Sequence, residues 1–256
     1  GTLLSTFKGE PLKVSIQCPA EAPRYCGLVV KGIKIQESHE WLKSRVASIG
    51  MRPINNIVDI TNYVMAELGE PMHAFDRSKL KGNEILVRLA KAGEKLTTLD
   101  GQAHDLHPED IVITDGTTPI ALAGVMGGGN SEIDDNTTEL VLEAANFNAV
   151  SIRKTAHRHN NRTDAAMRYE KSLDPELCPR AIARCFQLIK MVCPEAQAVS
   201  SMADCYPTKF PAITVTITTD RIRASLGAAL MDEKIIGIIS SLGFGVENKA
   251  GSLTIQ

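Results

Sequence analysis

The sequence contains few aromatic residues, a single tryptophan and no excess of positive charge. Aromatic side chains make up 4% of the 256 residues, against 43% hydrophobic residues, so one or two domains with a mainly aliphatic core are expected. A formal net charge of −2 argues against a general nucleic-acid-binding surface and leaves room only for a local basic patch. The absence of a long apolar run and of a signal peptide predicts a cytoplasmic protein without a membrane segment.

Cysteine pairs and the common catalytic motifs are also missing. No CxxC spacing occurs, so we expect reduced, packed thiols rather than disulfides or a metal site. There is no GxSxG, no HExxH and no phosphate-binding loop, and therefore no evident nucleophile, metal ligand set or nucleotide site. In any hydrolytic reaction, water is the expected attacking group. The six cysteines are Cys18, Cys26, Cys178, Cys185, Cys193 and Cys205.

Patterns of β-branched residues and turn residues predict a strand-rich first part. Strands are expected at residues 12–17 and 24–35, and a series of further strands between 83 and 147. Within that series, Asp100-Gly101 predicts a hairpin turn. Apolar residues at helical spacing predict the helices, the first of them capped by Ser38. The expected helices are 38–50, 56–69, 149–159 and 175–192.

A proline-containing connector separates a second, smaller unit. The predicted fold class is α+β, with a mixed β-domain and flanking helices over residues 1–205. A partial, truncated small α/β domain is expected over residues 212–256. Because the chain lacks an initial methionine and ends inside an expected strand, we expect it to be a fragment of a longer protein.

Polar residues are unusually dense between residues 52 and 62. Asn55 and Asn56 stand at the start of an expected helix, where their side chains suit capping of free backbone N–H groups. Thr61 and Asn62 lie further into that helix, where both are poor helix formers. A role facing a pocket explains the second pair better, and Arg52 is a weaker candidate for the same role.

Two titratable residues stand among apolar neighbours. His73, in "PMHAFD", is either a structural hydrogen-bonding residue or a site residue that Asp76 orients. Glu143, in "ELVLEAANF", must be paired or hydrogen-bonded if it is buried. An arginine would satisfy it, and so would the hydroxyl or ammonium group of a ligand. The residues alone leave both questions open.

Two further segments allow a structural and a functional interpretation. The glycine-rich "ALAGVMGGGNSE" (121–132) is either a turn closing a hairpin or a main-chain pocket floor, and it lacks the lysine and spacing of a phosphate loop. The stretch 153–171 holds six Lys or Arg residues against two acidic ones. It is either a solvated helix face or a phosphate-contacting patch.

Four segments, taken together, resemble a known family. They are "GMRPINNIVDITNYVMAELGEPMHAFD", "IALAGVMGGGNSEI", "VLEAANFNAVSIRKTA" and "RTDAAMRYEKSLDP". In this order they strongly resemble the central editing module of the bacterial phenylalanyl-tRNA synthetase beta subunit, from about residue 20 to 205. The segment from about Ala212 resembles the start of the following domain of that subunit.

The resemblance implies an editing hydrolase that deacylates mischarged tyrosyl-tRNA(Phe). A pocket built for phenylalanine cannot strongly reject an analogue that adds a hydroxyl, whereas a pocket that hydrogen-bonds the hydroxyl rejects phenylalanine by roughly four to five orders of magnitude at best. Glu143 matches the family residue that takes this role, and His73 matches the editing-site histidine. Thr61 and Asn62 match residues near the same pocket. Ala123, Gly124, Thr163 and Ala165 match residues that form the walls of the family's pocket.

The sequence departs from the family pattern on both sides of Thr163. "HNNRT" stands where the family usually has glycine and leucine before "RT". "YEKSLDP" has serine where a glycine usually follows the basic residue.

The resemblance also implies partners and cofactors. The expected partners are the acceptor end of tRNA(Phe), the tyrosine moiety and an alpha subunit in an α2β2 heterotetramer, with no membrane. ATP and Mg²⁺ are expected for the full synthetase, whose aminoacylation site lies on the alpha subunit, and no cofactor is expected in this fragment. The alternative function is a non-catalytic module of the synthetase that binds tRNA or a partner.

Overall fold

Strand β10 (Glu139–Asn146) lies at the centre of the first structural unit. Its last seven residues are all buried, which explains its almost continuous apolar sequence. It pairs antiparallel with β2 (Arg24–Lys31) on one side and with β3 (Met72–Asp76) on the other. The short strands β11 (Gln197–Ala198) and β12 (Ala203–Cys205) pair with the other edge of β2. The carboxyl group of Glu143 is therefore carried by an interior strand of its sheet.

This structure is a computed structural model that describes residues 12–256. The chain divides into two compact units, the first ending at Thr208 and the second comprising Lys209–Gln256. All six cysteines are free. No helix in the described part of the chain is long and apolar enough to cross a bilayer.

A second sheet of the first unit packs against the first sheet. Its strand order is β1-β4-β7-β8-β9, and the β5–β6 hairpin lies beside it. The predicted turn at Asp100-Gly101 is confirmed, with Gly101 at φ 78° between β5 and β6. The strands are β1 (Lys13–Ile16), β4 (Glu84–Leu89), β5 (Lys95–Thr97), β6 (Ala103–Asp105), β7 (Ile111–Thr114), β8 (Pro119–Leu122) and β9 (Met126–Gly127).

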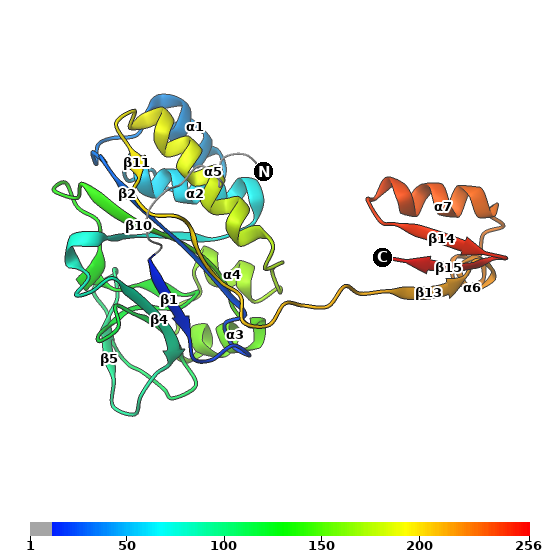
Figure 1. Ribbon diagram of the computed structural model, residues 1–256, viewed down its shortest axis with the longest axis horizontal. Coiled ribbons are helices and arrows are strands. Elements are labelled where there is room, and N and C mark those ends of the chain that lie inside the picture. Colours follow the sequence, from blue (N-terminus) through cyan, green and yellow to red (C-terminus); the bar gives the residue numbers. More distant parts are fainter. Residues whose placement is uncertain (1–11) are drawn as a thin grey trace. The chain divides into compact units, whose positions relative to one another are not determined.

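Helices cover the face of the first sheet that points away from the second sheet (Figure 1). The α+β class predicted from the sequence is confirmed. An apolar cluster fills the space between the two sheets. It includes Ile152 of α3 and Tyr169 of α4, which lie at its end. The covering helices are α1 (Glu40–Ser48), α2 (Asn56–Leu68) and α5 (Leu177–Val192); the helices at the end of the cluster are α3 (Ala149–Arg158) and α4 (Asp164–Tyr169).

Local chemistry sets the ends of α2. The side chain of Asn55 accepts hydrogen bonds from the N–H groups of Ile57 and Val58, at 3.1 and 2.9 Å, and so caps the helix as predicted. Gly69, at φ 80°, ends the helix. The expected cap at Ser38 is wrong. Its hydroxyl instead donates to Asp59 at 2.6 Å, because a charged acceptor on α2 binds it more strongly than the start of α1.

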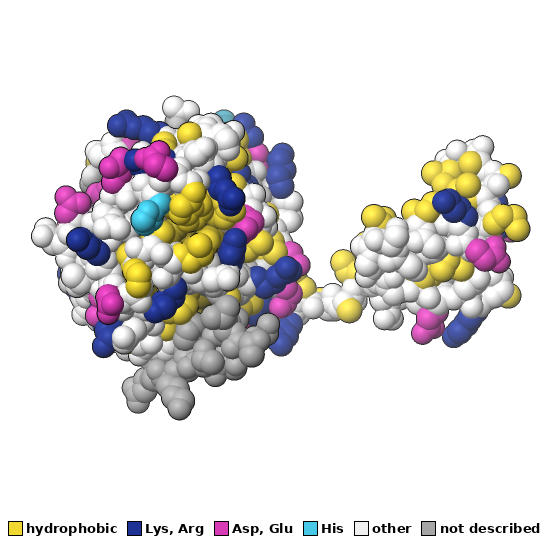
Figure 2. Space-filling view, turned by 90° about the horizontal axis from the view of Figure 1, so that it is seen from above, with side chains coloured by type: hydrophobic (Ala, Val, Ile, Leu, Met, Phe, Trp, Pro, Cys, Tyr) yellow, Lys and Arg dark blue, Asp and Glu magenta, His cyan; other side chains and the backbone are white. Residues whose placement is uncertain are grey.

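The second unit is a small antiparallel sheet with two helices. Its strand order is β13-β15-β14, with β13 (Val215–Thr218), β14 (Val246–Lys249) and β15 (Ser252–Ile255). The helices are α6 (Thr219–Leu226) and α7 (Asp232–Ser241). Several apolar side chains of this unit are exposed, among them Leu226, Met231, Leu242 and Phe244. On the face of the first unit shown in Figure 2, a group of hydrophobic side chains lies at the centre with a histidine beside it, and basic and acidic side chains are scattered over the rest of the face.

Candidate active site

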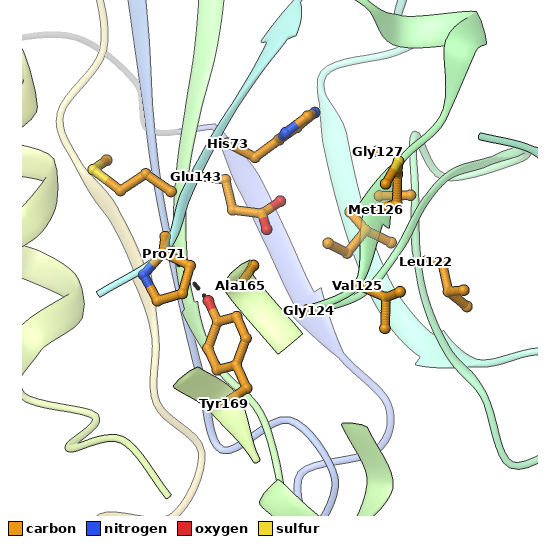
Figure 3. A pocket seen from close by; sticks show the side chains of 13 residues that line it. Pro71, His73, Leu122, Gly124, Val125, Met126, Gly127, Glu143, Ala165 and Tyr169 are labelled. Carbon is orange, nitrogen blue, oxygen red and sulfur yellow. Dashed lines mark hydrogen bonds between the residues drawn. The ribbon is translucent and has the colours of Figure 1, made fainter. Parts of the chain in front are cut away.

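His73 and Glu143 face the same pocket from neighbouring strands. His73 of β3 and Glu143 of β10 are directly paired in the antiparallel register. Paired residues of antiparallel strands place their side chains on the same face of the sheet. Figure 3 shows both side chains pointing towards the segment from Gly124 to Gly127.

The pocket has a cavity volume of about 80 Å³. A single water needs about 10–15 Å³ on this measure, so the pocket has room for a small group together with water. Most of its lining residues are apolar, and the titratable ones are Glu143, His73 and Tyr169. The lining residues are Pro71, Met72, His73, Ile113, Ala121, Leu122, Gly124, Val125, Met126, Gly127, Glu143, Ala165 and Tyr169.

The carboxyl of Glu143 is held by one tyrosine. The Tyr25 hydroxyl donates a hydrogen bond of 2.8 Å to Oε2. Burial raises the pKa of Glu143 to about 7, and the bond from Tyr25 opposes that rise. Within residues 12–256, the hydrogen bond of the Glu143 carboxyl is made by Oε2 and none is made by Oε1. The alternative that an arginine pairs with Glu143 is wrong, since Tyr25 takes that place.

The imidazole of His73 is held by packing rather than by hydrogen bonds. Its ring lies edge-on to Phe75 with 4.6 Å between ring centroids. Its Nε2 atom is buried and has no hydrogen-bond partner in the described chain. Burial lowers the pKa of His73 to about 4, so the ring is neutral at neutral pH. A buried nitrogen without a partner is costly, and a ligand or water in the pocket would relieve that cost.

Two glycines let the main chain approach the site. A Cβ on Gly127 would lie 2.5 Å from Cε1 of His73 and 2.7 Å from its Nε2, so only glycine leaves room for the ring. Gly124 has φ +67°, and a Cβ there would meet Ile152 at 2.8 Å and Phe147 at 3.1 Å. Gly124 is therefore required by its backbone conformation and by the apolar core behind the pocket wall.

Helix α4 closes one side of the pocket. Thr163 is its N-cap, accepting from the Ala166 N–H at 3.2 Å, and its hydroxyl donates to the carbonyl of Val125 at 2.9 Å. This bond ties the start of the helix to the glycine-rich segment. Ala165, two residues on, lines the pocket itself. The Tyr169 hydroxyl donates to the carbonyl of Ala145 at 3.0 Å and fixes the end of the helix against β10.

The structure does not bring every predicted site residue to the pocket lining. Ala123 is buried in the core beside it. Thr61 is buried on α2, and its hydroxyl donates to the carbonyl of Val58 at 2.7 Å. Asn62 is half-buried on the same helix, and Arg52 is exposed. None of these four lines the pocket, and their roles stay predictions.

Ion pairs occupy part of the basic stretch 153–171. Arg158 pairs with Glu109 and Asp110, and His159 also contacts Asp110. Arg162 pairs with Glu170. The remaining exposed basic side chains of α3 include Arg153, Lys154 and His157, which line a shallow depression together with Arg158. Much of the stretch is therefore structural, and a phosphate-contacting role stays a prediction for α3 alone.

The two departures from the family pattern fall on left-handed backbone. Asn160 has φ 48° and Ser172 has φ 64°. Glycine adopts this conformation without strain, whereas a Cβ costs roughly 1–2 kcal/mol, less for asparagine. The usual glycines of the family suit these two positions for this reason.

Tyr25, Gly127 and Tyr169 were not predicted as site residues. The sequence gives only a weak indication of a role for Tyr25, because a tyrosine in an apolar strand segment such as "RYCGLVV" is ordinary. Gly127 was only one of four glycines in its segment. Tyr25 bonds to Glu143, and Gly127 lies against the ring of His73. Each partner is distant in the sequence, so no local pattern predicts these contacts.

A known protein family matches most of the first unit. The family model of the B3/4 domain matches residues 21–194. The phenylalanine–tRNA ligase beta subunit of Carboxydothermus hydrogenoformans is 45% identical over 92% of this chain and 29% of its own length. That of Geobacillus kaustophilus is 40% identical over 96% of this chain and 31% of its own length.

The chain thus spans about three tenths of the length of these relatives. A solved N-terminal fragment of the phenylalanyl-tRNA synthetase beta-subunit from Pyrococcus horikoshii is similar at a TM-score of 0.49 and 11% identity, over 98% of this chain and 70% of that chain. That structural likeness is too weak to carry an argument.

Proposed function

This chain belongs to the B3/4 domain family, and on that premise we propose that it is the editing module of a phenylalanine–tRNA ligase beta subunit. Its reaction is hydrolysis of the ester in mischarged tyrosyl-tRNA(Phe). Water attacks the carbonyl carbon of the ester, and the bond from that carbon to the ribose oxygen breaks. The ribose oxygen takes up a proton, and tyrosine and tRNA are released.

The observation that carries the proposal is the open oxygen of Glu143. Oε2 is occupied by Tyr25, while Oε1 makes no hydrogen bond within residues 12–256, in a pocket whose lining residues are mostly apolar. A tyrosine ring suits the apolar walls, and its hydroxyl would donate to Oε1. Phenylalanine would leave the buried carboxyl without that bond, which is a costly arrangement. The pocket would therefore favour the substrate that carries the hydroxyl.

His73 is the proposed group beside the reacting ester. A neutral imidazole with a free Nε2 is able to orient the attacking water or the ester by a hydrogen bond. Thr163 contributes indirectly, since it holds the Val125 carbonyl and with it the glycine-rich wall. Thr61, Asn62 and Arg52 remain proposed contributors near the acceptor end.

The partners of the whole ligase are part of the proposal. They are the acceptor end of tRNA(Phe) and an alpha subunit in a heterotetramer, with ATP and Mg²⁺ serving the synthetic reaction. Within residues 12–256, no three His, Cys, Asp or Glu side chains lie together as a metal site. The donor set of this part of the chain therefore does not fit a metal ion, and no step of the proposed hydrolysis is assigned to one.

The test is hydrolysis of tyrosyl-tRNA(Phe) and phenylalanyl-tRNA(Phe) by the full ligase carrying this chain. We expect selective loss of tyrosyl-tRNA in the unmodified enzyme and loss of that selectivity in Glu143→Ala. The matched control is Glu139→Ala, at the start of the same strand and without a place in the pocket lining. It should keep the selectivity.

If the unmodified ligase hydrolyses neither ester, the editing proposal is wrong. The alternative, a module that binds tRNA or a partner without catalysis, would then take its place.

A further inference from the structure

Tyr25 reaches Glu143 diagonally across two strands. Tyr25 of β2 is paired with Ala145 of β10, two residues beyond Glu143. The residue directly opposite Glu143 on β2 is Gly27. A Cβ on Gly27 would lie 3.7 Å from Cε1 of Tyr25, an ordinary contact, so the ring lies alongside position 27. Diagonal neighbours at this spacing are within reach of an aromatic side chain.

Glu143 is thus flanked by a different residue on each neighbouring strand. His73 faces it from β3, and the Tyr25 hydroxyl meets it from the side of β2. Tyr25 is fully buried, and its hydroxyl has one proton to donate. That proton goes to Oε2, so Oε1 is the oxygen left for the pocket.

We propose that Tyr25 is a positioning residue that determines the hydroxyl specificity of the pocket, by orienting the Glu143 carboxyl and keeping it an acceptor. This inference rests on the proposed editing function. The Tyr25 hydroxyl does not reach the substrate in this arrangement; it acts through Oε2. A substrate phenol would then be the second hydroxyl to donate to the same carboxylate, at Oε1.

The electrostatics of the site agree with this role. Burial favours the protonated form of Glu143, and a protonated carboxyl would compete with the substrate as a donor. The hydrogen bond from Tyr25 favours the ionised form. Without the Tyr25 hydroxyl, the carboxyl would be free to rotate and would stay protonated to higher pH.

The experiment measures the ratio of tyrosyl-tRNA to phenylalanyl-tRNA hydrolysis by the full ligase from pH 6 to pH 9. In Tyr25→Phe we expect the ratio near pH 7 to fall about tenfold, the effect of one lost hydrogen bond to a charged group. The pH midpoint of the selectivity should rise, and the ratio should recover at high pH. A purely structural role would lower the melting temperature without moving that midpoint.

Tyr63→Phe is the matched variant, because it removes a tyrosine hydroxyl that accepts a hydrogen bond from Arg45 at 2.9 Å and does not line the pocket. It should leave the pH midpoint in place. A second probe keeps the side chain intact: 3-fluorotyrosine at Tyr25, a more acidic donor, should move the midpoint to lower pH.

Unchanged ratio and midpoint in both Tyr25 variants, with selectivity still abolished by Glu143→Ala, would overturn the inference and leave the editing function intact. Absence of selectivity in the unmodified ligase would instead remove the editing function on which the inference rests.

Discussion

His73 and Glu143 are cross-strand partners in the register of β3 and β10, although 70 positions separate them in the sequence. Burial acts on both in the direction of the neutral form: it lowers the pKa of His73 to about 4 and raises that of Glu143 to about 7. The pair therefore forms no ion pair at neutral pH. Nε2 of His73 is buried without a partner in the described chain, and the only hydrogen bond of the Glu143 carboxyl there is made by Oε2.

Replacing His73 tests whether its role is catalytic or structural. We expect His73→Ala to slow deacylation of tyrosyl-tRNA by at least about tenfold, because a positioned imidazole is lost beside the ester. The melting temperature should fall only modestly, because the ring makes no hydrogen bond through Nε2 and its packing, including that against Phe75, is what is lost. His39→Ala, an exposed histidine ahead of α1, is the control. A large drop in melting temperature with unchanged turnover would return His73 to a structural role.

The space beside the imidazole gives a second prediction. Gly127→Ala should lower turnover by roughly tenfold or more, because its Cβ would lie within 2.7 Å of two ring atoms of His73 and must displace the ring. In Gly129→Ala the new Cβ meets its nearest atom at 3.8 Å, an ordinary contact. Activity of the two variants, with melting temperatures measured in parallel, separates ring displacement from a general effect of alanine. Equal activity in both would contradict the prediction.

Glu70 predicts a pH dependence of stability. Burial raises its pKa to about 8, and Oε2 of its carboxyl is buried without a partner in the described chain. The folded state therefore holds a proton that the unfolded chain releases above about pH 4.5. The stability that this proton contributes is present below pH 4.5 and declines up to about pH 8, by about 1.4 kcal/mol per pH unit.

Glu70→Gln removes this titration while keeping the shape of the side chain. The difference in unfolding free energy between variant and unmodified chain, from urea titrations at pH 5 and pH 8, should favour the variant more at pH 8. Glu67→Gln is the control, because the Arg184 hydrogen bond lowers the pKa of Glu67 and its contribution is already complete at pH 5. A difference that does not grow between the two pH values would contradict the assignment.

The left-handed backbone at Ser172 gives a prediction about stability alone. Ser172→Gly should raise the unfolding free energy by about 0.5–1 kcal/mol, since relief of strain at φ 64° exceeds the entropy that glycine loses on folding. Lys171→Gly, at the exposed neighbouring position without positive φ, should lower it. Denaturant titrations of both variants measure the change in unfolding free energy. A loss of stability in Ser172→Gly would show that its backbone is not strained.

Sequence patterns predicted the local structure well where one residue controls it. Asn55 and Gly69 set the two ends of α2, and the Asp100-Gly101 turn sets the β5–β6 hairpin. These features depend on capping and on backbone conformation, which act within a few residues. The cap assigned to Ser38 was wrong because an acceptor 21 positions away, Asp59, binds the hydroxyl instead.

The sequence by itself determined the α+β class, a strand around Glu143 and the resemblance to an editing module. Only the tertiary structure decided that His73 lies opposite Glu143, that Gly127 makes room for the imidazole and that Tyr25 occupies one carboxyl oxygen. The physical reason is that strand register and side-chain packing bring together residues up to 118 positions apart. The order of residues along the chain does not show such contacts. Hydrophobic periodicity and turn chemistry, by contrast, depend on residues close together in the sequence, so a sequence can predict them.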